Sequence, residues 1–556
     1  MKRNLQKVLF TVFTTFILIL GTTGCTNNKV SSNSSPTEKT TEETTETPDT
    51  RKLATNLEYV VPTHSETIFY EDVQTNLANS IQKKLMDTKY TLEHPLVYYN
   101  PFGTNLRSAN IYFTTEKPCK IEYTIHVEQD NIPDFTQKLF INSDTEFTKE
   151  HSYQLIGLIP NVENTIYLTT YDQSGETQKS TFKIQVPEVN TAGELILDVT
   201  TRKEKPLTNG LFCVFYGRLT KDDGQILNID LYDNDGILRS EFVVDSYRTD
   251  NIQFIDNHIF YCIDEHRLAK VNALGQIVRI YDLEQYEFHH DLVYNKEQNH
   301  FLILVNDTQQ NTVEDMIISL NLESGEVQEV LDLKDILPEA YEKATLPEDK
   351  EKLDWAHINA IQLINNTDVI LSFRELSSIV KVDNIYNEPT LKYILCETNV
   401  WEDTSYTPYV YNKVGDFTAQ AGQHAITYVA GNSDDEYFLY MFNNNFTYSA
   451  TRPEINWSNY TLAQGKKENK NSYFYQYKIN ETEKTFELVN SFPVPYSQYV
   501  SNIQKLDHHY IICPGMKNMF LEYDQDGTII KEFKQQKSTI IYRTIKYDFT
   551  NFWFSE

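Results

Sequence analysis

Short segments in which apolar and polar residues alternate follow one another from about residue 194 almost to the C-terminus. They include GLFCVFYGR, QILNIDLYD, GILRSEFVV, HIFYCIDE and QIVRIYDL, and turn residues separate them. Alternation with a period of two is typical of β-strands that bury one face. This part of the chain is therefore predicted to consist of antiparallel strands.

The strand segments also repeat. NIQFIDNHIFYCID begins at Asn251, AIQLINNTDVILSF at Ala360 and NIQKLDHHYIICPG at Asn502, and the three resemble one another. About six such units, centred near residues 215, 258, 297, 365, 432 and 508, indicate a closed β-propeller. We predict an all-β chain with six blades over residues 191–556, and seven blades are the alternative. Insertions at 336–352, 401–422 and 443–472 are expected to gather at one end of the central channel, where a site would lie.

The region upstream, residues 56–190, has a different pattern. Thr67–Met86 is its most helix-like piece. The alternating segments ANIYFTTE, KIEYTIHVE, HSYQLIGLI and NTIYLTTYD follow, with turn residues between them. Short strands at this spacing predict a small N-terminal β-sandwich domain.

The first residues read as an export signal. A basic start, MKRNLQK, precedes the apolar run VLFTVFTTFILIL, which is too short for a confident membrane span. Residues 1–25 end at Gly24-Cys25, which resembles the cleavage and lipidation site of a lipoprotein. Residues 26–55 are rich in Ser, Thr and Glu and predict a disordered tether. We expect an extracytoplasmic protein anchored to the membrane through a lipid on Cys25. An ordinary signal peptide or an uncleaved anchor is the alternative.

Composition narrows the functions that the chain can have. Its 49 basic and 79 acidic residues give a formal charge of −30, which argues against a nucleic-acid partner. Beyond Cys25 the cysteines have neither metal-ligand spacing nor the pattern of a disulfide framework. We expect buried thiols, and one disulfide between neighbouring strands is the alternative. The five cysteines are Cys119, Cys213, Cys262, Cys396 and Cys513.

A histidine recurs at equivalent places in three of the units. His290, His357 and His424 are spaced 67 residues apart, and an apolar strand starts 11 to 13 residues after each of them. The pseudo-symmetry of a propeller directs equivalent positions to one shared axis, so the three histidines are predicted to share a site. The doublet His289-His290 leaves open which ring faces that site. Asp291 is expected to orient the ring of its partner.

The central unit, DWAHINAIQLINNTDVILSFRE, adds polar groups to this site. Asn359 shares a strand face with His357, and Arg374 ends the next strand. An imidazole, a carboxamide and a guanidinium suit a small tetrahedral anion. In the repeat frame Ser501 is equivalent to Asn359, which places it at the start of another inner strand.

Two other chemistries were weighed. Three histidines can bind zinc, but Arg374 and Asn359 suit an anion better than a cation, so no metal is predicted. A Ser-His-Asp hydrolase is disfavoured because the chain has no G-x-S-x-G motif around a serine.

The motifs FHHD, DWAHIN followed by SFRE, and GQHA resemble those of the bacterial aryl-sulfate sulfotransferases, a PAPS-independent family. The segments NPFGTNLRSANIYFTTEKPCKIEYTI and YQLIGLIPNVENTIYL resemble the N-terminal β-sandwich of that family. The resemblance implies a six-bladed propeller that transfers a sulfuryl group from a phenolic sulfate ester to a phenol. It also implies a ping-pong mechanism through a sulfohistidine, with no cofactor, and it allows a homodimer.

The resemblance assigns roles to individual residues. His424, in the QHA motif, is implied as the nucleophile. His357, Asn359 and Arg374 are implied as ligands of the sulfuryl oxygens, and Ser501 as the hydroxyl of the last blade. One histidine of the pair His289-His290 is implied as a further catalytic residue. Four aromatic residues in or near the insertions are candidates for packing on the aryl ring: Trp355, Tyr406, Tyr409 and Phe417.

Two other functions remain open at this point. One is a non-catalytic cell-surface propeller that binds an anionic glycan or a protein partner. The other is an aryl-sulfate hydrolase, which would turn over without an acceptor phenol.

Overall fold

The computed structural model describes residues 50–53, 57–60, 68–141, 145–217, 225–246, 250–397, 400–446, 448–455, 471–537 and 539–556. The predicted signal peptide and its Cys25 lie outside these residues. Strands β1 (Thr50–Leu53) and β2 (Leu57–Val60) pair antiparallel, so a strand begins within the last residues of the predicted tether.

Strands dominate the N-terminal domain, as predicted. They are β3 (Leu96–Tyr99), β4 (Ser108–His126), β5 (Phe135–Lys138), β6 (Thr148–Ile156), β7 (Glu163–Asp172) and β8 (Thr177–Gln185). The long strand β4 pairs with β3 and β6 along its first part and with β5 and β7 along its second. Alternate residues of β7 are buried, among them Ile166 and Leu168, which is the period-two pattern read from the sequence.

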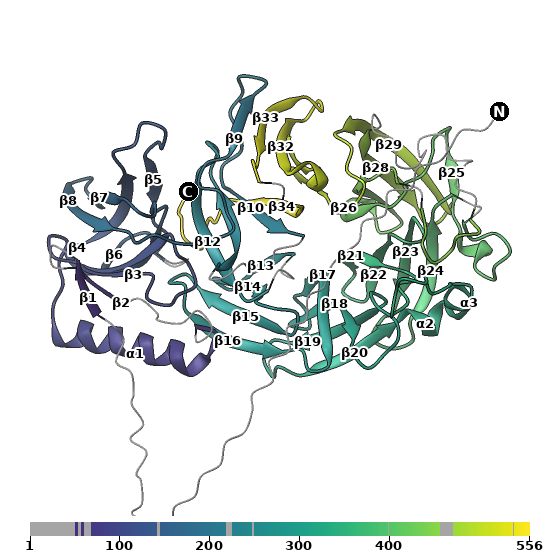
Figure 1. Cartoon of the computed structure of the whole chain (residues 1–556), viewed down its shortest axis with the longest axis horizontal. Helices are drawn as coiled ribbons and strands as arrows, with labels where there is room; N and C mark the ends of the chain where they lie inside the picture. Colours follow the sequence, from purple (N-terminus) through teal and green to yellow (C-terminus); the bar gives the residue numbers. More distant parts are fainter. Residues whose placement is uncertain are drawn as a thin grey trace, which may run out of the picture. The chain divides into compact units, whose positions relative to one another are not determined.

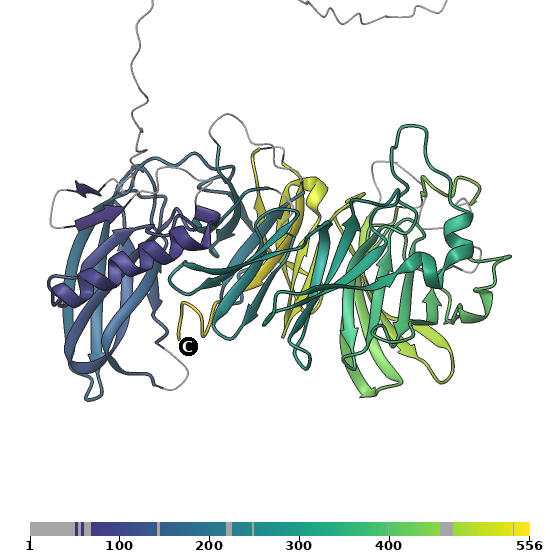
Figure 2. The same ribbon diagram turned by 90° about the horizontal axis from the view of Figure 1, so that it is seen from below.

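The predicted helix is present as α1 (Glu71–Asp87), four residues shorter at its start. Glu71 and Asp72 in its first turn and Lys84 in its last turn complement the helix dipole. Its buried Gln74 donates to two carbonyl oxygens of the N-terminal domain and accepts from the backbone N–H of Ile277 at 3.2 Å. The helix thereby joins the domain to the sheets that follow; Figure 2 shows α1 crossing the N-terminal strands.

Six sheets of four or five strands follow in the described part of the chain. The first contains β10 (Leu211–Tyr216), β11 (Leu227–Tyr232) and β12 (Leu238–Val244). The second contains β13 (Ile252–Ile255), β14 (His258–Cys262), β15 (Arg267–Asn272) and β16 (Ile277–Asp282). The third contains β17 (Tyr286–Asn295), β18 (His300–Asp307), β19 (Met316–Asn321) and β20 (Val327–Asp332).

The remaining three sheets repeat this order. The fourth contains β21 (Ile358–Ile364), β22 (Asp368–Phe373), β23 (Ser378–Asp383) and β24 (Thr390–Leu395). The fifth contains β26 (His424–Ser433), β27 (Glu436–Asn443), β28 (Ser472–Asn480) and β29 (Thr485–Val494), with β25 (Asn412–Val414) parallel to β29. The sixth contains β30 (Asn502–Leu506), β31 (His509–Cys513), β32 (Met519–Asp524) and β33 (Ile529–Lys534).

The two ends of this region close the ring of sheets. The last strand, β34 (Ile541–Tyr547), pairs with β10 as the innermost strand of the first sheet. The strand β9 (Asp198–Thr201) pairs with β33 at the outer edge of the sixth sheet. The inner strands β17, β21, β26, β30 and β34 contact one another in succession, and Figure 1 shows several of them around a common centre. The all-β prediction is confirmed, and six sheets in this order are consistent with a propeller.

The insertions contact one another, as expected. Helix α2 (Leu333–Ile336) leads into the first insertion, which carries α3 (Pro338–Glu342), and the second carries the short helix η3 (Thr407–Tyr409). The backbone N–H of Glu339 donates to the Tyr406 hydroxyl at 3.1 Å, and that of Thr345 donates to the Thr451 carbonyl at 2.8 Å. The first insertion thus contacts described residues of both other insertions.

The five described cysteines, from Cys119 to Cys513, are buried thiols. Cys213 and Cys262, the two that neighbouring strands could have joined, lie in β10 and β14 as thiols, and burial raises the pKa of both well above the usual value.

Candidate functional site

The predicted histidines lie where the inner strands are irregular. The ladder of β17 is interrupted around His290, that of β21 around Asn359, and that of β26 just after His424. The backbone is left-handed at His290 (φ 59°), His357 (φ 51°) and Ala425 (φ 53°). Bulges re-aim side chains, and such strained backbone conformations cluster at functional sites.

Two of the histidines share one carboxylate. The Oε2 atom of Glu314 lies 3.1 Å from Nε2 of His290 and 2.6 Å from Nδ1 of His357. The centroids of the two imidazole rings are 5.1 Å apart. Of the doublet, His290 is therefore the ring that meets His357, while the fully buried His289 lies edge-on behind His290 at 5.2 Å.

His357 has a second carboxylate partner. Nδ1 of His357 also lies 2.6 Å from Oδ2 of Asp354. Burial alone would lower the pKa of His357, and so would the charge of Arg374. The carboxylates of Asp354 and Glu314 outweigh both and raise the pKa of His357 to about 9. The ring is thus an imidazolium at neutral pH, and with Nδ1 engaged its Nε2–H remains as a donor.

Arg374 lies beside this cluster and is the most exposed cation of the site, with 24% of its side chain accessible. Its Nη2 atom is 3.9 Å from Asp354 and 3.4 Å from Glu375. Glu375 is itself fixed, because it accepts from the Ser449 hydroxyl at 2.9 Å and from the Thr451 backbone N–H at 2.8 Å. The third insertion thereby holds the residue that follows Arg374 in the chain.

His424 is held in one tautomer. Its Nδ1 atom lies 2.8 Å from Oδ1 of Asn444 and 3.1 Å from the carbonyl oxygen of Gly422. The Asn444 amide is oriented in turn, because its Nδ2 donates to the carbonyls of Ser497 and Val500, each at 3.0 Å. Both partners of Nδ1 are acceptors, so Nδ1 carries the proton and Nε2 carries the lone pair.

The charge state of His424 agrees with that tautomer. Burial lowers the pKa of His424 well below its usual value, and the positive charges of Arg374 and His357 lower it further. No described residue hydrogen-bonds Nε2 of His424. The site therefore combines a neutral imidazole with a bare nitrogen and, close by, at least two cations.

Asn359 and Ser501 are both buried at this centre, with their polar groups partly engaged. Nδ2 of Asn359 donates to the Gln423 carbonyl at 2.9 Å, which leaves its second N–H to donate elsewhere. The Ser501 hydroxyl bonds Ser497 Oγ at 2.8 Å and accepts from the Gly515 N–H at 3.1 Å. Ser501 thus shapes the loop whose Val500 carbonyl orients Asn444.

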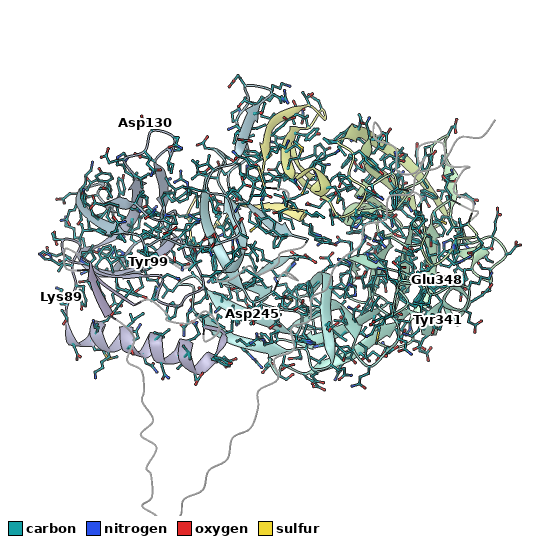
Figure 3. The ribbon with its side chains drawn as sticks, in the orientation of Figure 1. Lys89, Tyr99, Asp130, Asp245, Tyr341 and Glu348 are labelled. Atoms are coloured by element: carbon teal, nitrogen blue, oxygen red, sulfur yellow. The ribbon has the colours of Figure 1, made fainter. Side chains whose placement is uncertain are left out.

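Two of the four aromatic candidates, Trp355 and Phe417, pack against the protein core. Trp355 is fully buried, donates to Asp315 at 2.8 Å and packs edge-on against Tyr341 of the first insertion, which Figure 3 labels. Phe417 packs in the core of the fifth sheet against Tyr477 and Phe486.

Other aromatic rings contact the cationic residues of the site or lie next to rings that do. The guanidinium of Arg374 lies 5.9 Å from the centroid of Tyr499, and Phe446 meets Tyr499 edge-on at 5.1 Å. Tyr542 stacks on His290 at 5.2 Å and 12°.

Several residues of the site had no signal in the sequence that would single them out. Glu314 and Asn444 come from loops outside the histidine repeat. Asp354 differs from them, because it belongs to the DWAH motif together with His357. The carboxylate of Asp291 accepts from Arg543 at 3.0 Å and from Asn251 at 3.0 Å.

The acidic and imidazole groups of the cluster raise the question of a metal. Glu314, Asp354 and His357 bring one donor atom each within 4.8 Å of one another. We assign no metal to them, because a cation would have to displace the proton of His357 and lie beside Arg374.

Comparison with protein families identifies the chain. A family model described as Arylsulfotransferase (ASST) matches residues 197–551, well over half of the chain, and the model Arylsulfotransferase Ig-like domain matches residues 96–187. The chain belongs to the arylsulfotransferase family. Membership supports an aryl sulfotransferase activity in general, with aryl sulfates and phenols as substrates. The first match spans all six sheets and every residue of the site from His290 to Ser501.

Known structures add little to this family assignment. No curated protein matches the chain in sequence. A protein of unknown function from Bacteroides caccae aligns with a TM-score of 0.35 and 8% identity, over 61% of this chain and 99% of its own. A putative 6-phosphogluconolactonase from Bacteroides fragilis aligns with a TM-score of 0.32 and 9% identity, over 77% of this chain and 98% of its own. Similarities this weak carry no argument about function. Within the described ranges, no helix is long and apolar enough to cross a membrane.

Proposed function

We propose that this arylsulfotransferase moves the sulfuryl group of a phenolic sulfate ester to a phenol acceptor through a sulfohistidine on His424, without PAPS. One observation carries the proposal. His424 is neutral, its Nδ1–H is held by Asn444 and Gly422, and its Nε2 lone pair lies among cations that suit a sulfate ester.

In the first half-reaction Nε2 of His424 attacks the sulfur of the ester. The S–N bond forms as the bond between sulfur and the aryl oxygen breaks. The phenolate leaves with that electron pair and takes a proton from the imidazolium of His290 or His357. In the second half-reaction the acceptor phenol returns a proton to this imidazole as its oxygen attacks sulfur. The S–N bond then breaks, and its electron pair returns to Nε2.

The remaining residues of the site serve the transferring group. Sulfuryl transfer, like phosphoryl transfer, is expected to pass through a loose transition state with charge on the equatorial oxygens. The planar fork of Arg374 can hold two of these oxygens, and the second N–H of Asn359 can donate to a third. The ring of Tyr499, next to Arg374, is the candidate surface for an aryl group.

The proposal is tested with p-nitrophenyl sulfate in the presence and absence of a phenol. A ping-pong transferase releases nitrophenol in one burst without acceptor, turns over with it, and carries a sulfuryl adduct in its intact mass. Steady turnover without acceptor would indicate a hydrolase instead. If no nitrophenol is released and no sulfuryl adduct forms, sulfuryl transfer is refuted. The non-catalytic propeller that binds an anionic glycan or a protein partner would then be the favoured function.

Asn444→Ala is expected to lower kcat by about 10- to 100-fold, because His424 then loses the nearer of the two acceptors that fix its tautomer. The measurement is the size and rate of the nitrophenol burst. Asn295→Ala removes an equally buried amide that bonds Asn366 and Tyr386 instead, and serves as the control. An Asn444→Ala enzyme with an unchanged burst rate would show that the tautomer needs no support.

We further propose that the protein works outside the cytoplasm on a lipid anchor at Cys25. The export-type N-terminus and its GTTGC motif support this location. A homodimer stays a prediction from the family resemblance.

A further inference from the structure

Glu314 lies in the turn between β18 and β19, outside the repeat that places the histidines. One of its oxygens bridges Nε2 of His290 and Nδ1 of His357, at 3.1 and 2.6 Å. All three side chains are nearly buried, with between 9 and 11% of each accessible. A buried carboxylate in this position contacts two potential proton donors at once.

The backbone of Glu314 is held as firmly as its side chain. The residue is left-handed, with φ at 58°. Its N–H donates to the Asn306 side chain at 2.7 Å, and its carbonyl accepts from the N–H of Ile358 at 2.9 Å. The second bond ties Glu314 to the strand that follows His357. A strained conformation of this kind persists only where the surroundings enforce it, and it is common at functional sites.

We propose that Glu314 is a positioning residue that keeps His290 and His357 together as imidazolium ions. Two like charges with ring centroids 5.1 Å apart repel each other, and an anion between them offsets that repulsion. The proposal rests on the sulfuryl transfer proposed above. It explains how a chain with a charge of −30 presents paired positive donors to a sulfate ester.

Other charged groups face the pair from the neighbouring elements. Asp250, before β13, lies 3.9 Å from Nδ1 of His290, and Asp354 bonds His357. Arg374 follows β22, and the neutral His424 begins β26. From β34, Tyr542 stacks on His290, while Arg543 pairs with Asp291 at 3.0 Å. Among these groups Glu314 is the one whose oxygen contacts both rings.

The ionisation state of Glu314 follows from the positive charges around it. Burial alone would raise the pKa of the Glu314 carboxyl, but the charges of His357 and His290 lower it well below its usual value. The Glu314 carboxylate therefore stays ionised. His357, with its raised pKa, keeps its proton below about pH 9 and loses it above.

The first test compares the pH dependence of kcat/KM for p-nitrophenyl sulfate in the wild type, Glu314→Gln and Glu314→Asp. In Glu314→Gln we expect the apparent pKa of the alkaline limb to be lower by at least about one unit, because the rings then lose protons more easily. Glu314→Asp restores the carboxylate and should move the limb back. A uniform loss of activity with the limb in place would assign Glu314 a merely structural role and overturn the proposal.

Glu481→Gln is the matched control. Glu481 is buried to a similar degree, and its carboxylate pairs with Lys381 at 2.7 Å rather than with a histidine. This variant is expected to leave the alkaline limb where the wild type has it. A shift as large as that of Glu314→Gln would show that the loss of any buried glutamate moves the alkaline limb, and would contradict a specific role of Glu314.

The second test needs no turnover. Proton NMR of ring-labelled histidine, assigned with His290→Gln and His357→Gln, follows each ring during a pH titration. In Glu314→Gln both rings are expected to titrate at lower pH than in the wild type. Unmoved titrations would overturn the role of Glu314 even in an active enzyme. If Glu314→Gln shifts the titrations but the wild type transfers no sulfuryl group, the proposed function is refuted and the positioning role of Glu314 stands.

Discussion

Replacing His424 with alanine is expected to lower sulfuryl transfer by about 10⁴-fold or more and to abolish the protein adduct. The ring of His424 is neutral, and its Nε2 is the atom that would form the S–N bond. The measurement is the nitrophenol burst from p-nitrophenyl sulfate, together with the intact mass after incubation with the donor alone. His357→Ala should slow transfer but still allow an adduct to form, because it removes a donor and not the nucleophile.

His300→Ala provides the control for a lost histidine. His300 begins β18, and its Nε2 contacts the Asn321 side chain at 3.1 Å, so the ring has no part in the cluster. This variant is expected to retain wild-type burst kinetics. A sulfuryl adduct on His424→Ala would contradict the proposed nucleophile and direct attention to another histidine of the site.

Replacing Arg374 with methionine is expected to reduce kcat by about 10²- to 10³-fold. Methionine keeps much of the volume and removes the charge that would stabilise the sulfuryl oxygens. The kcat of Arg374→Lys should lie between those of the wild type and Arg374→Met, because a lysine restores the charge but not the planar fork that binds two oxygens. Pre-steady-state kinetics with p-nitrophenyl sulfate separate the loss in the chemical step from a change in donor binding.

Arg279→Met is the matched control for Arg374. Arg279 is partly buried, donates to the carbonyls of Leu322 and Glu323, and stacks on Tyr281 in the second sheet. Its loss should leave kcat unchanged. If Arg374→Met raised KM alone, with the rate of the burst intact, the arginine would serve donor binding and not the transition state.

Much of the fold was readable because a β-strand with one buried face has to alternate. The segments HIFYCIDE and HHYIICPG predicted β14 and β31, and the helix-like run near residue 70 predicted α1. The closure of the ring was not readable. Strand β34 joins β10, and β9 joins β33, across more than three hundred residues, and no local pattern specifies such a partner.

The candidate site divides in a similar way. The equal spacing of His290, His357 and His424 could be seen because a repeat places equivalent residues at equivalent positions. Glu314 and Asn444 could not be found in this way, because each lies in a loop whose position the strand repeat does not specify. The aromatic candidates show a related limit: Trp355 packs inward among insertions whose course the sequence does not reveal.

The sequence by itself determined the all-β architecture, the repeated units and the family motifs, because strand alternation and repeat spacing are local properties of a chain. Only the tertiary structure decided the chemical state of each histidine. The carboxylates of Glu314 and Asp354 hold His357 as a cation against the effect of burial, while burial keeps His424 neutral and Asn444 fixes its tautomer. Protonation depends on which charges lie within a few ångströms, and these neighbours come from segments far apart in sequence.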